Sequence, residues 1–157
     1  MMNTTTSSAD AVRPPMGRAA TSLLAISVLF FLVAMVTAPF RTGAPDPHPW
    51  ADGWQVLLTG WMGVFFGIYV WLANPLVFAA WLLTTKRLRA QAVVLAVLAL
   101  LFGSSFLSQH QIVVNEGGGV EPVHLDAIGY WCWLASFGAA LIGAALLPGR
   151  TKTRAAG

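Results

Sequence analysis

Long uncharged runs alternate with short polar segments along this chain. Four runs lack Asp, Glu, Lys, Arg and His altogether: 19–40, 54–85, 90–109 and 127–149. Each reaches or exceeds the ~20 apolar residues needed to cross a hydrocarbon core about 30 Å thick. Because unpaired backbone groups are costly in lipid, we expect helices rather than open strands. The pattern predicts an all-α membrane fold, a bundle of four transmembrane helices with spans at about 20–39, 56–84, 90–109 and 127–147.

Segments outside these runs complete the expected domain plan. Residues 1–18 are polar with little to bury, and they predict a disordered cytoplasmic tail. Residues 19–149 form one transmembrane domain, and 150–157 form a second cytoplasmic tail. A cleavable signal peptide is the alternative for the first run, since "VTA" at 36–38 suits a cleavage site. Pro39 follows that site and the run is long, so we expect a retained helix.

The second run, 54–85, is too long for a simple span. Its 32 residues would extend about 48 Å as a helix, so it must tilt, kink or project. Pro75 predicts a kink, because it removes a backbone hydrogen bond. Gly63 and Gly67 form a GxxxG motif, which predicts close packing on the face that also carries Gly60 and Asn74.

The last two helices are also expected to carry single faces of small residues. These are Ala92, Ala96, Ala99 and Gly103, then Gly129, Cys132, Ser136, Ala140 and Gly143. We expect packing within the monomer, with a homodimer interface as the alternative and the first helix peripheral.

Charge sets the expected orientation. Of nine Lys and Arg residues, eight fall in the two tails and the 86–89 loop, and only Arg41 lies on the other side. Five of the six acids and all three histidines lie in segments on the same side as Arg41. Basic residues concentrate in cytoplasmic segments, so both termini are expected in the cytoplasm. The net charge is +3, but the basic residues are spaced between the apolar runs instead of forming one patch. We therefore predict no nucleic-acid partner.

The stretch "QHQIVVNEGGGVEPVHLD" (109–126) predicts a short β-hairpin-like outer loop between the third and fourth helices. In the expected register Ile112 faces Pro122 and His110 faces His124. That pairing makes His110, His124 and Asp126 weak candidates for a metal site, against the alternative of solvated loop residues. Glu116, at the tip, is a candidate for partner contact.

Other residues limit the chemistry. No Asp, Glu, Lys, Arg or His side chain lies inside a predicted span, which disfavours a proton-coupled transporter and histidine-ligated haem. Cys132, the single cysteine, excludes an intrachain disulfide. Asn74, beside Pro75, is expected to bond freed carbonyls or Ser104, Ser105 or Ser136. The tryptophans are interpreted as interfacial anchors. We predict no catalytic residue and no cofactor.

Three stretches carry a resemblance: "WLANPL" (71–76), "VNEGGG" (114–119) and "GYWCWLAS" (129–136). They resemble WxANPL, NEAG-like and GYWLWLAS segments of a group of small bacterial inner-membrane proteins. The resemblance covers roughly 55–147 and departs at Gly117 and Cys132. It implies a bacterial four-helix protein and no particular reaction. The positions it marks for mutation are Trp71, Asn74, Pro75, Asn115, Glu116, Tyr130 and Trp131.

These observations favour a multi-pass inner-membrane protein that is a non-catalytic accessory factor or complex subunit. Its expected partners are the lipid bilayer and either a larger membrane complex or a second copy. One alternative is a membrane enzyme or ligand-binding protein with an outward-facing His/carboxylate site. Another is an oligomeric channel or transporter component.

Overall fold

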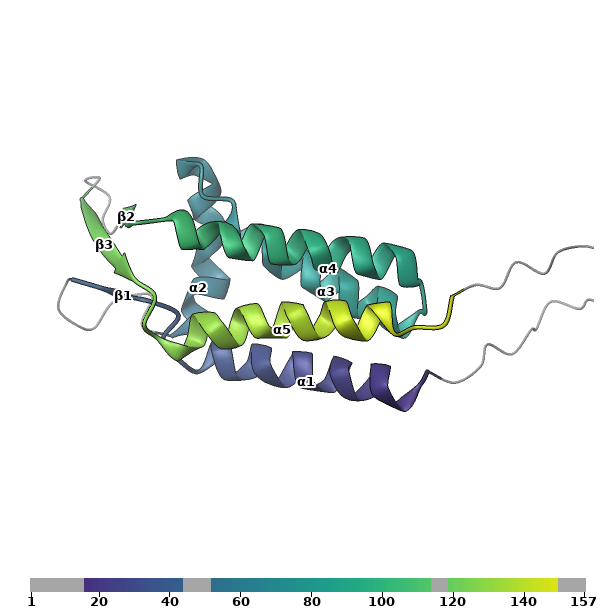
Figure 1. Ribbon diagram of the computed structural model, residues 1–157. Helices are drawn as coiled ribbons and strands as arrows, with labels where there is room; N and C mark the ends of the chain where they lie inside the picture. The colour runs from purple at the N-terminus through teal and green to yellow at the C-terminus, as the bar shows by residue number, and fades with distance from the viewer. Residues whose placement is uncertain (1–15, 44–51, 114–118, 150–157) are drawn as a thin grey trace, which may run out of the picture.

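The computed structural model describes residues 16–43, 52–113 and 119–149, which are mostly helical (Figure 1). Three helices are long and apolar enough to cross a membrane. They are α1 (Arg18–Met35), α4 (Arg89–Ser104) with its 3₁₀ extension η3 (Ser105–Ser108), and α5 (Ile128–Ala145). The expectation of long apolar helices over these three runs is therefore confirmed.

The second run is not one helix. It is divided into α2 (Gly53–Thr59), η1 (Gly60–Phe66), η2 (Val70–Leu72) and α3 (Ala73–Thr85). The break falls at Gly67, whose φ of +76° is the left-handed conformation that glycine tolerates. Pro75 instead lies in the first turn of α3, where a missing N–H costs nothing. The predicted single helix over 56–84 and the kink at Pro75 are both wrong.

Residues 53–66, formed by α2 and η1, run across the end of the bundle instead of along it, and we call them the arm (Figure 1). The predicted glycine face is also wrong, because Gly60 and Gly63 pack locally and a Cβ on Gly67 would meet nothing within 4 Å. A Cβ on Gly60 would lie 2.9 Å from Trp71 Cδ1, and one on Gly63 would lie 3.3 Å from the Ile68 carbonyl oxygen. The GxxxG pair therefore folds the arm back on its own continuation.

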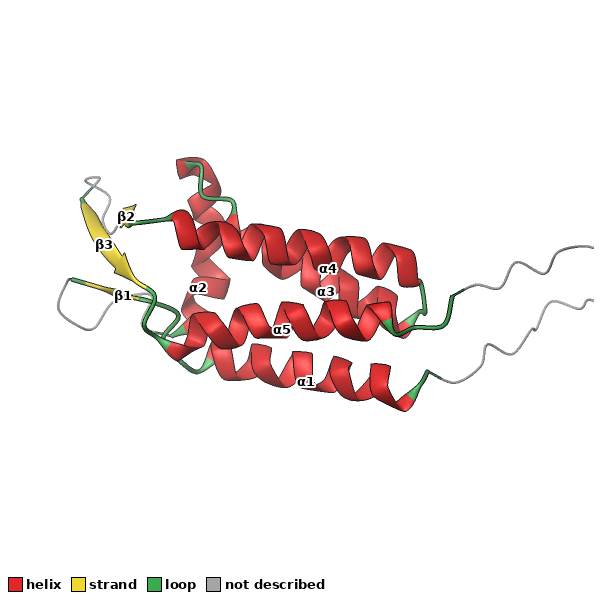
Figure 2. Ribbon diagram, in the orientation of Figure 1, coloured by secondary structure: helices red, strands yellow, loops and turns green. Residues whose placement is uncertain are grey.

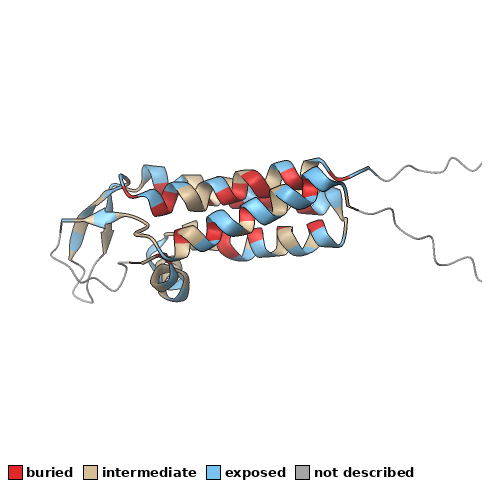
Figure 3. Cartoon of the chain, turned by 90° about the horizontal axis from the view of Figure 1, so that it is seen from below, coloured by how far each residue is buried: buried red, intermediate tan, exposed pale blue. Residues whose placement is uncertain are grey.

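Small residues on α4 and α5 do pack within the chain, as expected. Ala92, Ala96 and Ala99 are fully buried, and a Cβ on Gly103 would meet the Phe137 ring at 3.0 Å. Figure 3 shows the buried positions on the sides of the helices that face one another. On α5 the predicted positions are buried except Cys132, which is half-buried.

The first helix is not peripheral, contrary to expectation. It lies alongside α5 in Figure 1, and Ser27 Oγ donates to the Ser136 carbonyl at 2.7 Å. Trp81 Nε1 of α3 donates to the same Ser27 hydroxyl at 2.8 Å. Phe31, next along this side of α1, meets the Trp81 ring edge-on with ring centroids 5.4 Å apart. One hydroxyl thus connects three helices.

A small antiparallel sheet lies at the end of the bundle opposite the start of α1 and the end of α5 (Figure 2). Its strand order is β1 (Arg41–Thr42), β3 (Val120–His124), β2 (Gln111–Val113). The predicted hairpin is present as β2 and β3, while β1 was not predicted. Ile112 pairs with Glu121 instead of Pro122, so the expected register is wrong by one residue.

Candidate functional site

The sheet separates the two histidines that the sequence suggested as metal ligands. Val123 N donates to the His110 carbonyl at 3.0 Å, so His110 lies opposite Val123, while His124 pairs with Arg41. Neighbouring residues of a strand point to opposite faces, so the one-residue shift removes the predicted pairing of the imidazoles. Asp126 Oδ2 instead accepts a hydrogen bond from Arg41 Nη1 at 3.2 Å, in an exposed ion pair.

Within the described ranges, no group of three or more His, Cys, Asp and Glu side chains is arranged to hold a metal ion. Glu116, the candidate for partner contact, lies outside the described residues, as do Asn115 and Gly117.

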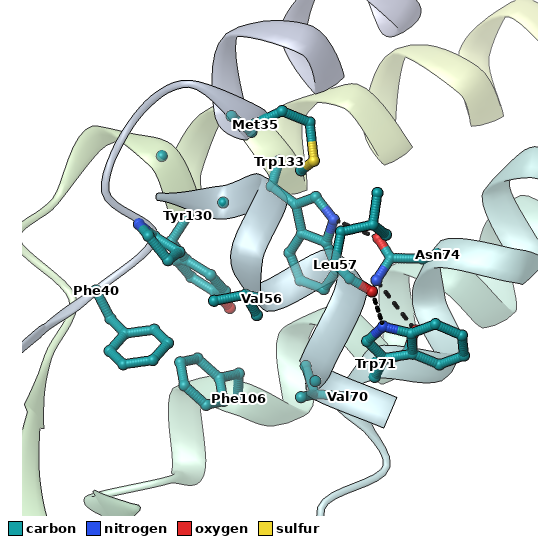
Figure 4. A pocket seen from close by; sticks show the side chains of 15 residues that line it. Met35, Phe40, Val56, Leu57, Val70, Trp71, Asn74, Phe106, Tyr130 and Trp133 are labelled. Carbon is teal, nitrogen blue, oxygen red and sulfur yellow. Dashed lines mark hydrogen bonds between the residues drawn. The ribbon is translucent and has the colours of Figure 1, made fainter. Parts of the chain in front are cut away.

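A network of buried polar groups lies where the arm meets the bundle (Figure 4). Asn74 is 5% exposed at the start of α3, and its Oδ1 accepts a hydrogen bond from Trp133 Nε1 at 2.9 Å. Its Nδ2 donates to the Trp71 carbonyl at 3.2 Å, and Trp71 Nε1 donates to the Leu57 carbonyl at 2.8 Å. Asn74 therefore bonds a nearby carbonyl, as expected, but a tryptophan replaces the expected serines. The network connects the arm, η2, α3 and α5.

A cavity of about 90 Å³ lies beside this network, under the base of the arm. Its walls include Phe40, Phe106 and Tyr130, whose rings lie around the space in Figure 4. Tyr130 OH donates to the Gly103 carbonyl at 3.1 Å, and Asn74 is occupied by the two tryptophans. Since these polar groups are engaged by the protein, the cavity suits a hydrocarbon group and offers no nucleophile or general base.

The arm carries exposed large apolar side chains, which we call the stripe. They are 47–77% exposed: Trp54, Leu58, Trp61, Met62, Phe65, Phe66 and, just beyond, Tyr69. Gly53 is buried, and a Cβ there would overlap the Ala34 carbonyl. The arm thus packs closely on α1 at Gly53, while its large apolar side chains remain exposed.

Sequence reasoning missed the stripe and the roles of Trp71 and Trp133. An uncharged run does not distinguish a transmembrane span from an arm that lies across the bundle. The residues of the stripe were therefore assigned to a predicted transmembrane helix. The tryptophans were interpreted as lipid anchors, although an indole N–H needs an acceptor when buried. Asn74 was the available signal, because it is the main polar side chain within reach of both rings.

No protein-family model, no curated protein and no solved structure matches this chain.

Proposed function

We propose that this chain is a multi-pass membrane protein that acts as a non-catalytic subunit, docking on a partner membrane protein through the arm. The observation that carries the proposal is the stripe on α2 and η1. Exposed apolar surface of this kind is typical of sites that contact a partner protein or the membrane. Close packing of Gly53 on α1 and of Gly60 on Trp71 fixes the base of the arm, so the stripe is presented on a preformed support.

The proposed membrane placement has four crossings. The fourth is the apolar stretch Val70–Thr85, whose 16 residues extend about 25 Å, slightly less than the hydrocarbon thickness. α1 and α4 begin, and α3 ends, at the end of the bundle opposite the sheet (Figure 1). These helix ends carry Arg18, Arg89 and Lys86. The excess of basic residues at one end supports cytoplasmic termini. The resemblance to small bacterial proteins supports the inner membrane as the location.

The buried polar groups favour a non-catalytic role. Ser27 binds Trp81 and the Ser136 carbonyl, while Asn74 binds Trp133 and the Trp71 carbonyl. Each stabilises contacts between segments, so neither is available to a substrate. The alternative of an outward-facing His/carboxylate enzyme loses its main support, because His110 and His124 are not paired.

Purification from native membranes in mild detergent tests the docking proposal. The Trp61→Ser, Phe65→Ser double variant should lose the co-purifying protein while the Val94→Ser control, on an exposed face of α4, retains it. Equal recovery of the same partner with both variants would contradict docking through the arm. A reporter fused after Gly157 tests the orientation separately, with cytoplasmic activity expected.

A further inference from the structure

An open groove of about 470 Å³ lies between α4 and the chain that returns from the arm. One wall is the connecting segment from Gly67 to Val70. The other wall comes from α4, η3 and the residue that follows them: Leu98, Leu101, Phe102, Ser105 and Gln109. The volume lies within the range of about 300–1,000 Å³ that holds small ligands.

The groove runs along α4. The residues of its α4 wall recur at helical spacing from Leu98 to Gln109, which places them on one face over a length of about 16 Å. Because α4 with η3 is long and apolar enough to cross a membrane, the groove is parallel to the direction of a lipid chain.

Polarity changes along the groove in one direction. The end near Leu98 and Leu101 is lined by aliphatic carbon. The end toward the sheet has the Ser105 hydroxyl and the Gln109 amide, and none of the lining residues is charged. Ser105 Oγ donates its hydrogen to the Phe102 carbonyl at 2.6 Å, so the Gln109 amide N–H is a donor at this end that can bond an ester carbonyl. A hydrocarbon chain that ends in an uncharged ester group matches this change from an apolar to an uncharged polar lining.

We propose that the groove binds one acyl chain of a phospholipid, with the ester region at Gln109 and the chain along Leu101 and Leu98. The proposal rests on the membrane placement proposed above and not on the partner. The groove is continuous with the exposed apolar face of α4, where Leu101 and Val94 are more than half exposed and lipid is the surrounding solvent.

The connecting wall is fixed in place, which distinguishes the groove from an ordinary lipid-facing surface. Ile68 N donates to the Gly63 carbonyl at 2.9 Å, and Leu72 N donates to the Tyr69 carbonyl at 3.0 Å. Gly67, with φ of +76°, sets the direction in which the chain leaves the arm toward the bundle. A bound chain would therefore meet protein on two sides.

Photo-crosslinking tests the groove. The full chain is reconstituted in phosphatidylcholine vesicles that carry a diazirine in the middle of an acyl chain, and labelled peptides are found by mass spectrometry. Labelling should concentrate on 67–70 and 98–102. Val70→Phe should reduce it about tenfold, the effect of excluding roughly two methylene groups. Leu98→Phe should act in the same way at the other end, and the Ile142→Phe control, at an exposed position of α5, should leave labelling unchanged.

Each outcome decides one point. If both faces of α4 are labelled equally, and neither groove variant reduces the labelling, the proposal is overturned. The labelling would then come from unspecific surrounding lipid. More than a few-fold gain with phosphatidylglycerol would overturn the uncharged ester assignment. Labelling from the opposite leaflet would contradict the orientation while leaving the groove intact. Loss of a co-purifying partner in arm variants, with unchanged labelling, would separate the two proposals.

Discussion

Replacing Asn74 with Leu tests the polar network that connects the arm to the bundle. The change removes the acceptor of Trp133 Nε1, 2.9 Å away, and the donor to the Trp71 carbonyl. The indole N–H is then left in an apolar setting, with a cost of about 1–3 kcal/mol. Side-chain hydrogen bonds between membrane helices average about 0.6 kcal/mol and reach about 1.7. We therefore expect Asn74→Leu to lower the free energy of unfolding by about 1–2 kcal/mol.

The assay is reversible unfolding in mixed micelles, followed by far-UV circular dichroism. A double-mutant cycle with Trp133→Phe isolates the pair, and we expect a coupling energy of about 1 kcal/mol, since the second change removes the unpaired donor. Ser105→Ala is the control, because its hydroxyl bonds a carbonyl within its own exposed turn. Additive effects of the two changes, within about 0.3 kcal/mol, would refute the reasoning.

The same unfolding assay checks three further predictions. Gly67→Ala should cost about 1–2 kcal/mol because its φ is +76°, whereas Gly138→Ala, inside α5 with open space around it, should stabilise by about 0.5–1 kcal/mol. Equal effects would argue against a strained break. Ser27→Ala should cost about 1–2 kcal/mol, because Trp81 Nε1 loses its acceptor. Asp126→Asn should change stability by less than about 1 kcal/mol, as the ion pair with Arg41 is exposed.

The long apolar helices could be predicted, because their length and lack of charge follow from the thickness of a bilayer. The division of 54–85 could not, since "GWMGVFFG" reads equally as a packing motif and as a turn. What decides it is close packing within the run itself: Gly60 against Trp71, and Gly63 against Ile68. The 32-residue length was the one warning that a simple span would not fit.

The candidate site was predicted only in part. Asn74 was correctly singled out, but its partner Trp133 lies 59 residues away, and no local pattern encodes that contact. The hairpin was found from β-branched flanks and a glycine-rich middle. Its register was wrong by one residue because Val113, not Val114, pairs with Val120, and β1, a two-residue strand that also pairs with β3, was not predicted. Such short strands carry almost no sequence signal.

The depth of spin labels along the arm tests the central claim most directly. In a Cys132→Ser background, nitroxides at Trp54, Leu58, Trp61 and Phe65 are compared by oxygen and nickel-chelate relaxation. An arm across the bundle predicts depths that agree within about 5 Å, half a helix diameter. One continuous span predicts a steady gradient of about 16 Å from Trp54 to Phe65, which would contradict the account. Val94 and Leu101 on α4 provide the reference gradient of about 10 Å.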